Sequence, residues 1–290
     1  MRIFKNLYET KSFTKSGIVA LGYFDALHLG HRYLLKKLVE LSEERGVDSF
    51  VLTYPDMPKK NYDNRRVIDL KYKIDEIKKI GVKNLILCNY DESFYSMVPT
   101  VFLSLLKKNF NITGFLVGKD FSFGKDREGN VVTLLENGFS IDVVEPFTVD
   151  DKYLSTGFIK NRISEGDIDK ANNLLGRPFF VEGIVRKGKQ LGRKLGFPTM
   201  NVRNDNICYP AEGSYATVTS IKDKKYFSMT YVSKDIIETH LFNYDDFRYN
   251  FKIKIDFFKK IRDNQRFEDM NGLIEQLFID LSTVKRYFNL

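Results

Sequence analysis

Two kinds of hydrophobic pattern divide this chain. In the first half, short apolar runs that predict strands alternate with segments whose apolar residues recur at helical spacing. The predicted strands cover residues 18–21, 50–53, 85–88, 115–117 and 141–144, and the predicted helices cover 31–45, 70–80 and 99–108. Gly46 and Gly81 stand where they can end the first two helices. Strands separated by such helices favour parallel βαβ units, in which ligands bind beyond the carboxyl ends of the strands.

In the second half the pattern changes to strand-like runs, at residues 179–185, 215–221, 226–232, 237–242 and 250–257. In the last run Phe251, Ile253 and Ile255 alternate with charged residues, which indicates one buried and one solvated face. A helix closes the chain, with an apolar stripe of Leu273, Leu277, Leu281 and Val284. The predicted fold class is therefore α/β followed by an antiparallel barrel or sandwich with a C-terminal helix. We place the domain boundary after a helical stretch at 167–175, which gives domains 1–175 and 176–290.

Composition and charge narrow the class of protein. The chain has 290 residues, 43% of them hydrophobic, and its net charge of +8 favours anionic partners such as nucleotides and phosphorylated metabolites. Cys88 and Cys208 are far apart and fit neither a disulfide framework nor a zinc site. No apolar run has the length that spans a bilayer, and the N-terminus lacks the apolar core of a signal peptide. We expect a cytoplasmic protein without a membrane partner.

Two of the three histidines lie in one short stretch, GYFDALHLGHR at residues 22–32. His28 and His31 follow the first predicted strand and begin the first predicted helix, where backbone N–H groups and the helix dipole favour phosphate. Gly22 and Gly30 allow a ligand to approach the backbone closely. Two ordinary histidines at a helix start are the alternative, but the position at the end of a strand favours a phosphate site.

Several motifs carry a family resemblance. HxGH preceded by GYFD resembles the nucleotidyltransferase superfamily. The segments that narrow the resemblance are VGKDFSFGKDREGN (117–130), LLGRPFFVEGIVRKGKQLGRKLGFPTMNV (174–202), YPAEGSYATV (209–218) and ETHLFNYDDFRYNFKIKIDFFKKIRDNQRF (238–267). Over essentially its whole length the chain resembles the bifunctional bacterial riboflavin kinase/FAD synthetases.

The resemblance implies a Rossmann-like nucleotidyltransferase domain followed by an antiparallel β-barrel flavokinase domain. The second domain would phosphorylate riboflavin with ATP to give FMN, and the first would transfer AMP from ATP to FMN to give FAD and pyrophosphate. Riboflavin, FMN, FAD and ATP are thus the implied partners and Mg²⁺ the implied metal, and no nucleic acid is expected. No motif or pattern in the sequence indicates an oligomeric state.

In the first domain the resemblance assigns catalysis to His28 and His31. It assigns nucleotide binding to Gly22, Tyr23, Phe24, Asp25, Gly30, Ser155, Thr156 and Lys160, and flavin binding to Asp120, Phe121 and Phe123. Tyr23 and Ala26 replace an Asn and a Gly of the family turn, and the element TYPDMP (53–58) lacks the usual His. The family's SSTRIR element aligns with residues 155–160, where Phe158 and Lys160 replace two arginines. Lysine keeps the charge without the bidentate fork, and phenylalanine keeps neither.

In the second domain the resemblance makes Glu238 the base for the ribityl hydroxyl. Thr199 and Asn201 supply hard oxygen ligands suited to Mg²⁺. A glycine-rich flap over the nucleotide would contain Gly183, Lys187, Gly188 and Gly192, and the flavin would contact Arg262 and Phe267. A P-loop motif is absent from the sequence. The family's NIGxxPT element is also missing, and TYVSKDII (230–237) stands in its place.

Three alternatives follow from these residues. The chain is a bifunctional flavin-cofactor enzyme, which is the main prediction. It is a riboflavin kinase alone, with an impaired N-terminal domain that acts as a scaffold or a flavin-binding regulator. Or it is a non-enzymatic regulator that binds flavin or RNA, although it has no aromatic RNA-binding signature.

Overall fold

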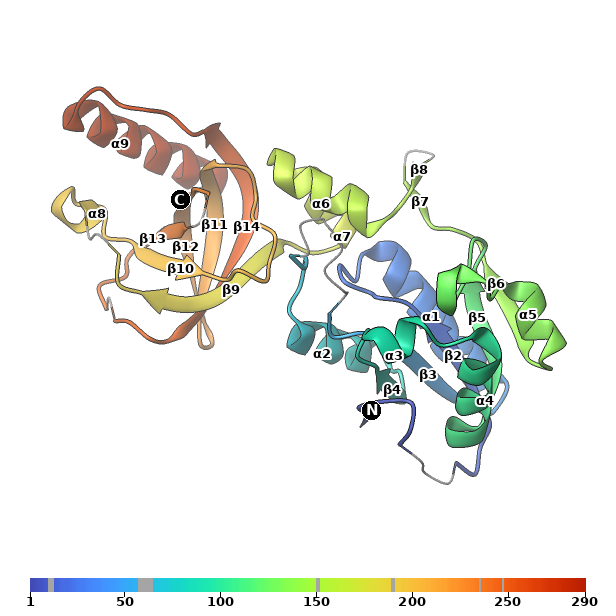
Figure 1. Ribbon diagram of the computed structural model, residues 1–290. Coiled ribbons are helices and arrows are strands. Elements are labelled where there is room, and N and C mark those ends of the chain that lie inside the picture. Colours follow the sequence, from blue (N-terminus) through green and yellow to red (C-terminus); the bar gives the residue numbers. More distant parts are fainter. Residues whose placement is uncertain (10–12, 57–64, 150–151, 189–190, 235, 247) are drawn as a thin grey trace. The chain divides into compact units, whose positions relative to one another are not determined.

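The computed structural model describes residues 1–9, 13–56, 65–149, 152–188, 191–234, 236–246 and 248–290 (Figure 1). The chain divides into two compact units. The first comprises Met1–Asn64 with Asp69–Leu154, and the second comprises Arg65–Ile68 with Ser155–Leu290. Among the described residues, no helix has the length and apolar character needed to cross a membrane.

The first unit contains a six-stranded sheet in which every neighbouring pair is parallel. Its strands are β1 (Arg2–Phe4), β2 (Gly17–Leu21), β3 (Asp48–Thr53), β4 (Asn84–Leu87), β5 (Ile112–Gly118) and β6 (Ser140–Val144), in the order β1-β4-β3-β2-β5-β6. The chain runs outward from β2 through β3 to β4 and then returns to place β5 on the other side of β2. The β2/β5 boundary is therefore a topological switch point, beyond which ligands bind in such sheets.

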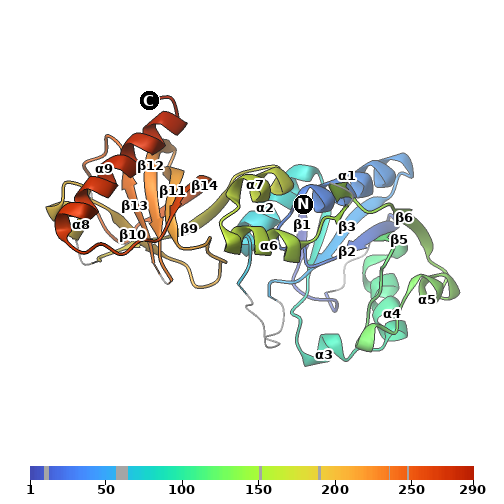
Figure 2. The same ribbon diagram turned by 90° about the horizontal axis from the view of Figure 1, so that it is seen from above.

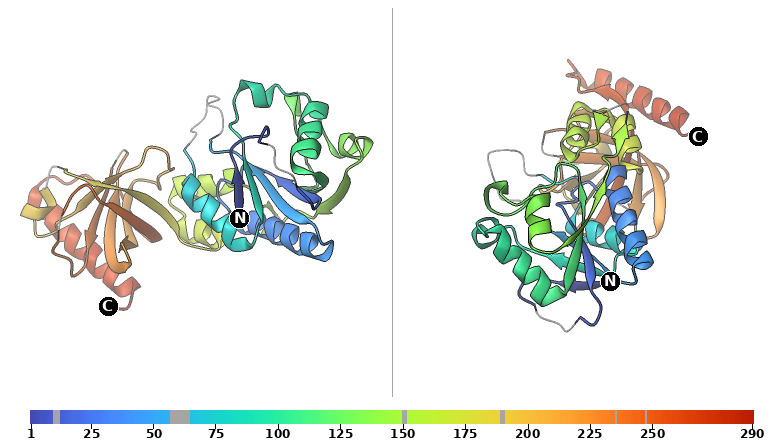
Figure 3. Two further views of the ribbon diagram at one scale, coloured as in Figure 1. Left: turned by 90° about the horizontal axis from the view of Figure 1, so that it is seen from below. Right: turned by 90° about the vertical axis from the view of Figure 1, so that its right-hand side faces the viewer.

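Helices cover both faces of this sheet (Figure 3). They are α1 (Leu29–Glu44), α2 (Leu70–Ile80), α3 (Glu92–Tyr95), α4 (Pro99–Phe110) and α5 (Val131–Glu136), with a 3₁₀ turn at Lys125–Arg127 and a small hairpin of β7 (Thr148–Val149) and β8 (Lys152–Tyr153). Helices α1 and α2 contact each other on one face, and α4 and α5 lie on the opposite face. Gly81 ends α2 in the left-handed conformation, as the sequence predicts. The parallel α/β prediction is thus confirmed.

The second unit contains a closed, antiparallel barrel. Its strands are β9 (Phe179–Arg186), β10 (Met200–Arg203), β11 (Gly213–Ile221), β12 (Lys224–Val232), β13 (Ile237–Leu241) and β14 (Lys252–Asp263), in the order β10-β13-β12-β11-β14-β9. Five of the strands match predicted runs, and β10 is an additional short strand. Closure gives each of these six strands a hydrogen-bonded neighbour on both sides.

Successive side chains of each strand point alternately into the barrel and outward, so the barrel has an inner and an outer face of different character. On the inner face a network of hydroxyl groups is fully buried and hydrogen-bonded, formed by Thr217, Thr219, Ser228, Thr230 and Thr239. On the outer face Ala216 and Met229 pack against Val284 of α9 (Met270–Tyr287), which lies along the barrel (Figure 2). The outer face beneath α9 is therefore where side chains of the barrel meet the C-terminal helix.

Two further helices, α6 (Thr156–Glu165) and α7 (Ile168–Leu175), precede the barrel, and the short helix α8 (Leu191–Lys194) lies between β9 and β10. Helices α6 and α7 belong to the second compact unit, since Asn172 of α7 donates to the Phe257 carbonyl at 2.9 Å. The compact units therefore divide before α6, whereas the predicted domain boundary at 175/176 lies after α7. The functional boundary at 175/176 stays a prediction.

Candidate active sites

The histidine turn joins β2 to α1, and His28 is the N-cap of that helix. The Nδ1 atom of His28 accepts a hydrogen bond from the His31 backbone N–H at 3.2 Å. In the neutral ring the proton must therefore lie on Nε2, because Nδ1 is already an acceptor. The two imidazole rings stack with their centroids 3.7 Å apart. The cap thus fixes both the tautomer and the orientation of His28.

Both histidines of this turn are held neutral. Burial lowers the pKa of His28 from its ordinary value of 6.5 to about 4. Burial also lowers the pKa of His31, and the neighbouring His28 and Lys73 lower it further. The His31 Nδ1 atom is buried and has no hydrogen-bond partner within the described part of the chain. Near neutral pH the pair can donate hydrogen bonds to a phosphate without bringing formal charge to it.

The backbone of the turn is strained at two residues other than glycine. Phe24 has φ 51° and Leu27 has φ 43°, in the left-handed region that side chains disfavour. Ala26, the replacement for a family glycine, is not one of the positive-φ residues, so its methyl group meets no such conflict. A Cβ at Gly30 would make tight contacts, at 3.2 Å to Phe147 Cβ and 3.3 Å to the His28 ring, so a side chain there would have to push the ring aside slightly.

A cleft of about 380 Å³ opens at the carboxyl ends of β2, β3, β4 and β5. It brings together five residues that the sequence assigned to the nucleotide or the flavin, namely Gly22, Tyr23, Asp120, Phe121 and Phe123. The remaining predicted residues of the turn, Phe24, Asp25, His28, Gly30 and His31, do not line it. The cleft therefore joins the β2 turn to the segment after β5, across the switch point.

Sequence reasoning missed an aromatic group that lines the same cleft, namely Tyr54, Tyr90, Phe94, Tyr95 and Phe102. Tyr54 and Tyr90 meet edge to face at 5.0 Å, and Tyr90 stacks with Tyr95 at 6.1 Å. Tyr54 and Tyr90 follow the carboxyl ends of β3 and β4. Because ligands bind beyond these ends, this position in the sequence could have identified both residues as candidates. Flat aromatic surfaces of this kind suit a planar ring system.

The element that aligns with the family's SSTRIR begins α6, in the second compact unit. Ser155 is the helix N-cap, and its Oγ accepts from the Phe158 N–H at 3.2 Å. The guanidinium of Arg162 lies 5.3 Å from the Phe158 ring and forms an ion pair with Glu165 at 2.7 Å. Arg162, the nearest candidate to replace a lost arginine, is thus engaged within its own helix. The nucleotide-binding roles of Ser155, Thr156 and Lys160 stay predictions.

A second cavity, of about 320 Å³, lies between the outer face of the barrel and α9. It brings together five predicted residues of the kinase domain, namely Gly192, Thr199, Glu238, Arg262 and Phe267. Its walls are completed by Phe197, Met229, Leu273 and Leu277. The cavity is thus largely apolar, and the carboxylates of Glu238 and Asp280 and the guanidinium of Arg262 are its charged groups.

Strand register positions the polar side chains at this cavity. Glu238 of β13 lies opposite Asn201 of β10 on one side and Tyr231 of β12 on the other. Directly opposed residues of antiparallel strands place their side chains on the same face. Thr199 immediately precedes β10. The hydrogen bonds between β10 and β13 therefore bring the PTMN segment next to Glu238, although the two are far apart in the sequence.

Two glycines of the predicted flap lie against the predicted metal ligands. A Cβ on Gly188 would lie 2.4 Å from Asn201 Nδ2, and a Cβ on Gly192 would lie 3.4 Å from Thr199 Oγ1. Only glycine at position 188 leaves room for the Asn201 amide, whereas glycine at position 192 is required by the Phe197 carbonyl oxygen, which a Cβ would meet at 2.3 Å. The oxygen donors of Thr199 and Asn201 suit Mg²⁺. Among the described residues, no group of three or more His, Cys, Asp or Glu side chains could hold a metal.

The other two flap predictions have different surroundings. Gly183 lies inside β9, where a Cβ would meet Val202 Cγ1 at 2.4 Å and the Arg203 carbonyl oxygen at 3.0 Å. It allows β9 and β10 to approach closely and is a strand residue, not part of a loop. Lys187 is exposed directly after β9. Of the four residues predicted for the flap, Lys187 and Gly188 therefore follow β9 directly, Gly192 lies in α8, and Gly183 lies inside a strand. Their role at the nucleotide stays a prediction.

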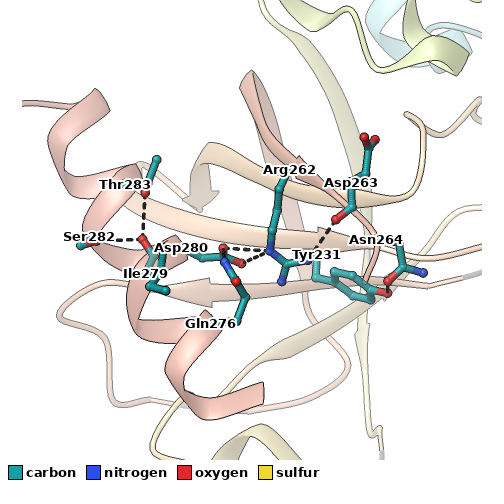
Figure 4. Close-up of polar contacts among 9 residues, drawn as sticks. All are labelled: Tyr231, Arg262, Asp263, Asn264, Gln276, Ile279, Asp280, Ser282 and Thr283. Atoms are coloured by element: carbon teal, nitrogen blue, oxygen red, sulfur yellow. Dashed lines mark hydrogen bonds and ion pairs between the residues drawn. The ribbon is translucent and has the colours of Figure 1, made fainter. Parts of the chain in front are cut away.

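Arg262 is held by two residues of α9 that the sequence did not single out (Figure 4). Its Nε donates to both carboxylate oxygens of Asp280 at 2.9 Å, and Gln276 Nε2 donates to Asp280 Oδ1 at 2.8 Å. Arg262 Nη1 donates to the Asp263 carbonyl at 3.0 Å. Asp280 is 1% exposed, so its charge is balanced by Arg262.

Two smaller contacts fix the rim of the cavity. Tyr231 donates its hydroxyl proton to Asn264 Oδ1 at 2.6 Å (Figure 4). Asn264 Nδ2 in turn donates to Glu212 at 2.9 Å. His240 Nδ1 lies 2.9 Å from the Pro198 carbonyl, so it must carry the proton and donate. Burial lowers the pKa of His240. His240 thus holds the turn that carries Thr199.

The fold thus combines an α/β unit that has a cleft at its switch point with a barrel unit that has a cavity beneath its C-terminal helix, an arrangement that fits a two-domain transferase. Residues 10–157 match the FAD synthetase family, and residues 175–288 match the riboflavin kinase family. The chain belongs to the family of bifunctional riboflavin kinases/FMN adenylyltransferases. The predicted resemblance is thereby confirmed.

Relatives with both activities in their names match this chain over nearly its full length. The bifunctional riboflavin kinase/FMN adenylyltransferase of Bacillus subtilis (strain 168) is 31% identical, with 94% of this chain and 92% of the relative covered. That of Buchnera aphidicola subsp. Schizaphis graminum is 30% identical, with 100% of each covered. A solved structure from Streptococcus pneumoniae, described as a macrolide-efflux protein, superposes with a TM-score of 0.88 at 25% identity over 98% of each chain.

Proposed function

We propose that the barrel unit phosphorylates riboflavin with ATP and that the α/β unit adenylylates the resulting FMN to FAD. The observation that carries the proposal is the convergence of Glu238, Thr199 and Arg262 on one apolar cavity. These residues come from three separate segments, which sequence proximity alone would not gather.

In the kinase reaction the isoalloxazine ring of riboflavin would lie in the cavity against Phe267 and Met229, with Arg262 at its polar edge. Glu238 would accept the proton of the ribityl 5′-hydroxyl as its oxygen forms a bond to the γ-phosphorus of ATP. The bond between that phosphorus and the ADP oxygen breaks, and ADP leaves. The opposed strands β10 and β13 hold the base and the metal ligand Asn201 at a fixed separation.

Thr199 and Asn201 would hold Mg²⁺ together with phosphate oxygens. Bound there, the metal would neutralise negative charge on the transferred phosphoryl group. Gly188 leaves the Asn201 side chain free of the steric contact that a Cβ would make at 2.4 Å. A Thr199→Val protein should therefore need more Mg²⁺ for half-maximal activity, while Tyr231→Phe should not.

In the adenylyltransferase reaction an oxygen of the FMN phosphate attacks the α-phosphorus of ATP, and pyrophosphate leaves. His28 and His31, both neutral, would donate hydrogen bonds to phosphate oxygens on which charge builds up. The N-terminus of α1 directs further N–H groups at the same anion. The aromatic residues of the cleft, with Asp120 and Phe121, would take the flavin.

One observation favours the alternative of a kinase with an impaired α/β unit. Phe158 stands where the family has an arginine, and Arg162 stacks on Phe158 and pairs with Glu165. If no other cation contacts the triphosphate in its place, FAD formation would be slow although the fold is intact.

One assay separates these functions. Purified protein with ATP, Mg²⁺ and riboflavin should accumulate FMN, and the same protein supplied with FMN and ATP should release FAD and pyrophosphate in equal amounts. Absence of FMN from folded protein would refute the kinase proposal. FMN formation without FAD in the second reaction would establish the kinase-only alternative.

We propose a cytoplasmic location because both cysteines are free thiols. Cys88 and Cys208 are both buried and lie in different compact units. Burial raises the pKa of Cys88 to about 12, so the group stays a thiol. Fractionation of cells that produce the protein should recover both activities with the cytoplasmic enzymes.

A further inference from the structure

Lys73 of α2 is a buried lysine beneath the histidine turn. It is 2% exposed, whereas Lys71 and Lys78 on the same helix are exposed. Burial of an ammonium group costs free energy unless hydrogen bonds or opposite charges replace its contacts with water. Its contacts therefore indicate what the protein gains by burying it.

The ammonium group bridges the loops that follow two neighbouring strands. Lys73 Nζ donates to the Tyr23 carbonyl at 2.9 Å and to the Tyr54 carbonyl at 2.7 Å, and it lies 3.5 Å from Thr53 Oγ1. It also lies 4.6 Å from the centre of the Tyr23 ring. Tyr23 follows β2 and Tyr54 follows β3, and both side chains line the proposed nucleotide and flavin cleft.

The Tyr23 carbonyl is held from two sides. It accepts the Thr53 hydroxyl at 2.9 Å as well as the Lys73 ammonium. This carbonyl belongs to the peptide that enters Phe24, the first strained residue of the turn. Strained backbone persists only where its surroundings fix it, and these two donors fix it here.

The charge of Lys73 also acts on the catalytic pair. Two groups besides burial lower the pKa of His31: His28 on its own turn and Lys73 on α2. The lysine thus helps to keep His31 neutral as well as holding the backbone of the turn.

We propose that Lys73 is a positioning residue for adenylyl transfer, whose ammonium clamps the Tyr23 and Tyr54 carbonyls so that the strained turn presents its histidines to the phosphates. The role rests on the proposed adenylyltransferase function of the α/β unit. Lys73 acts through the turn and need not touch either substrate.

The test compares Lys73→Met with Lys71→Met, which makes the same change at an exposed position of the same helix. Misplacement of catalytic groups by about 1 Å can cost about 100-fold in rate, so Lys73→Met should lower the kcat of FAD formation by about that factor. The KM values for ATP and FMN should change much less. Lys71→Met should match the wild type, and riboflavin phosphorylation by the same chains serves as an internal control. Folded Lys73→Met protein with wild-type kcat, or with a loss confined to KM, would overturn the proposal.

Two further measurements decide the outcome if Lys73→Met does not fold or if FAD formation is not detected in the wild type. Thr53→Val removes the other donor to the Tyr23 carbonyl at constant shape, and its kcat should fall by about tenfold, as for one lost hydrogen bond; an unchanged kcat contradicts the clamp.

The chain has three histidines, so their NMR titrations can be followed individually. In Lys73→Met the His31 pKa should rise and the His28 and His31 signals should shift, while His240 stays unchanged. Unaltered signals in folded protein would contradict the role of Lys73 whatever the activity.

Discussion

The two active sites of this chain are held in place by different means. In the barrel unit, Asn201 and Glu238 lie opposite each other on hydrogen-bonded strands of a closed barrel. In the α/β unit, His28 and His31 lie on a turn with strained residues at Phe24 and Leu27. The first geometry follows from a ladder of backbone hydrogen bonds, whereas the second depends on contacts such as the N-cap of α1. Sequence changes in loops should therefore weaken FAD formation before FMN formation.

The largest expected effect tests the rigid site. Glu238→Gln keeps the shape of the side chain but cannot accept the hydroxyl proton, so FMN formation should fall by about 1,000-fold. FAD formation from added FMN should stay at the wild-type rate, because the two sites are built from different units. Separate chromatographic assays of both reactions measure this. A variant that keeps most of its kinase rate would exclude Glu238 as the base.

The next prediction concerns the wall of the kinase cavity. Asp280→Asn leaves the charge of Arg262 without its buried partner and should lower the free energy of unfolding of the barrel unit by about 3 kcal/mol. The KM for riboflavin should rise as Arg262 loses its orientation. The matched control is Asp169→Asn, which breaks the exposed 2.6 Å pair with Lys259 and should cost under about 1 kcal/mol. Urea unfolding measures both, and equal losses would show that Asp280 is no more important than a surface residue.

The strained turn is tested by His28→Asn. Asparagine is a good N-cap, so α1 keeps its first hydrogen bond, but the Nε2 donor is lost. FAD formation should fall by about 100-fold, as for one donor to a developing oxyanion, with FMN formation unchanged. Steady-state kinetics of each reaction provide the measurement, and circular dichroism verifies that the helix content is kept. Wild-type FAD formation would remove His28 from the mechanism.

The smallest effect is a pH dependence of the α/β unit. The pKa of His28 is about 4 in the folded protein and 6.5 in an ordinary environment, so below pH 6.5 the unfolded state binds a proton that the native state does not. Stability is unaffected above pH 6.5 and falls as the pH drops toward 4. Between pH 7 and pH 5 this loss should be about 2 kcal/mol from His28 alone, in the same direction as the contribution of His31.

Urea titrations at the two pH values test this dependence, with His28→Asn as the comparison. The variant should lose less stability than the wild type, since asparagine does not titrate. Equal losses in both proteins would mean that His28 is already protonated in the native state.

Much of this architecture could be predicted from the sequence. Apolar runs predicted the strands, because β2 to β5 are buried along most of their length and the barrel strands alternate between buried and more exposed residues. The motifs predicted Thr199 and Glu238, and the cavity brings them together. Strand β10 was missed because its four residues, Met200–Arg203, are too few to show a clear period.

The parts that could not be predicted depend on tertiary contacts. On a helical wheel Lys73 is one of several lysines of α2, and its burial is visible only once β2 and β3 are in place. Asp280 is one acidic residue on an amphipathic helix, and its pairing with Arg262 depends on how α9 lies along the barrel. Gly183 resembles the neighbouring loop glycines, but a close approach of two strands explains it. In each case the sequence shows the residue type but does not show which residue it contacts in the fold.

The position of α9 has a consequence for synthesis. Helix α9 supplies Leu273, Leu277 and Asp280 to the kinase cavity, and it follows all six barrel strands along the chain. On the ribosome, the α/β cleft can therefore form while the barrel is still being made, since domains fold from the N-terminal side. Glu238, the predicted base, emerges before the helix that completes the wall of its cavity. A nascent chain stalled before Met270 would contain every residue of the α/β cleft but would lack the α9 wall of the barrel cavity.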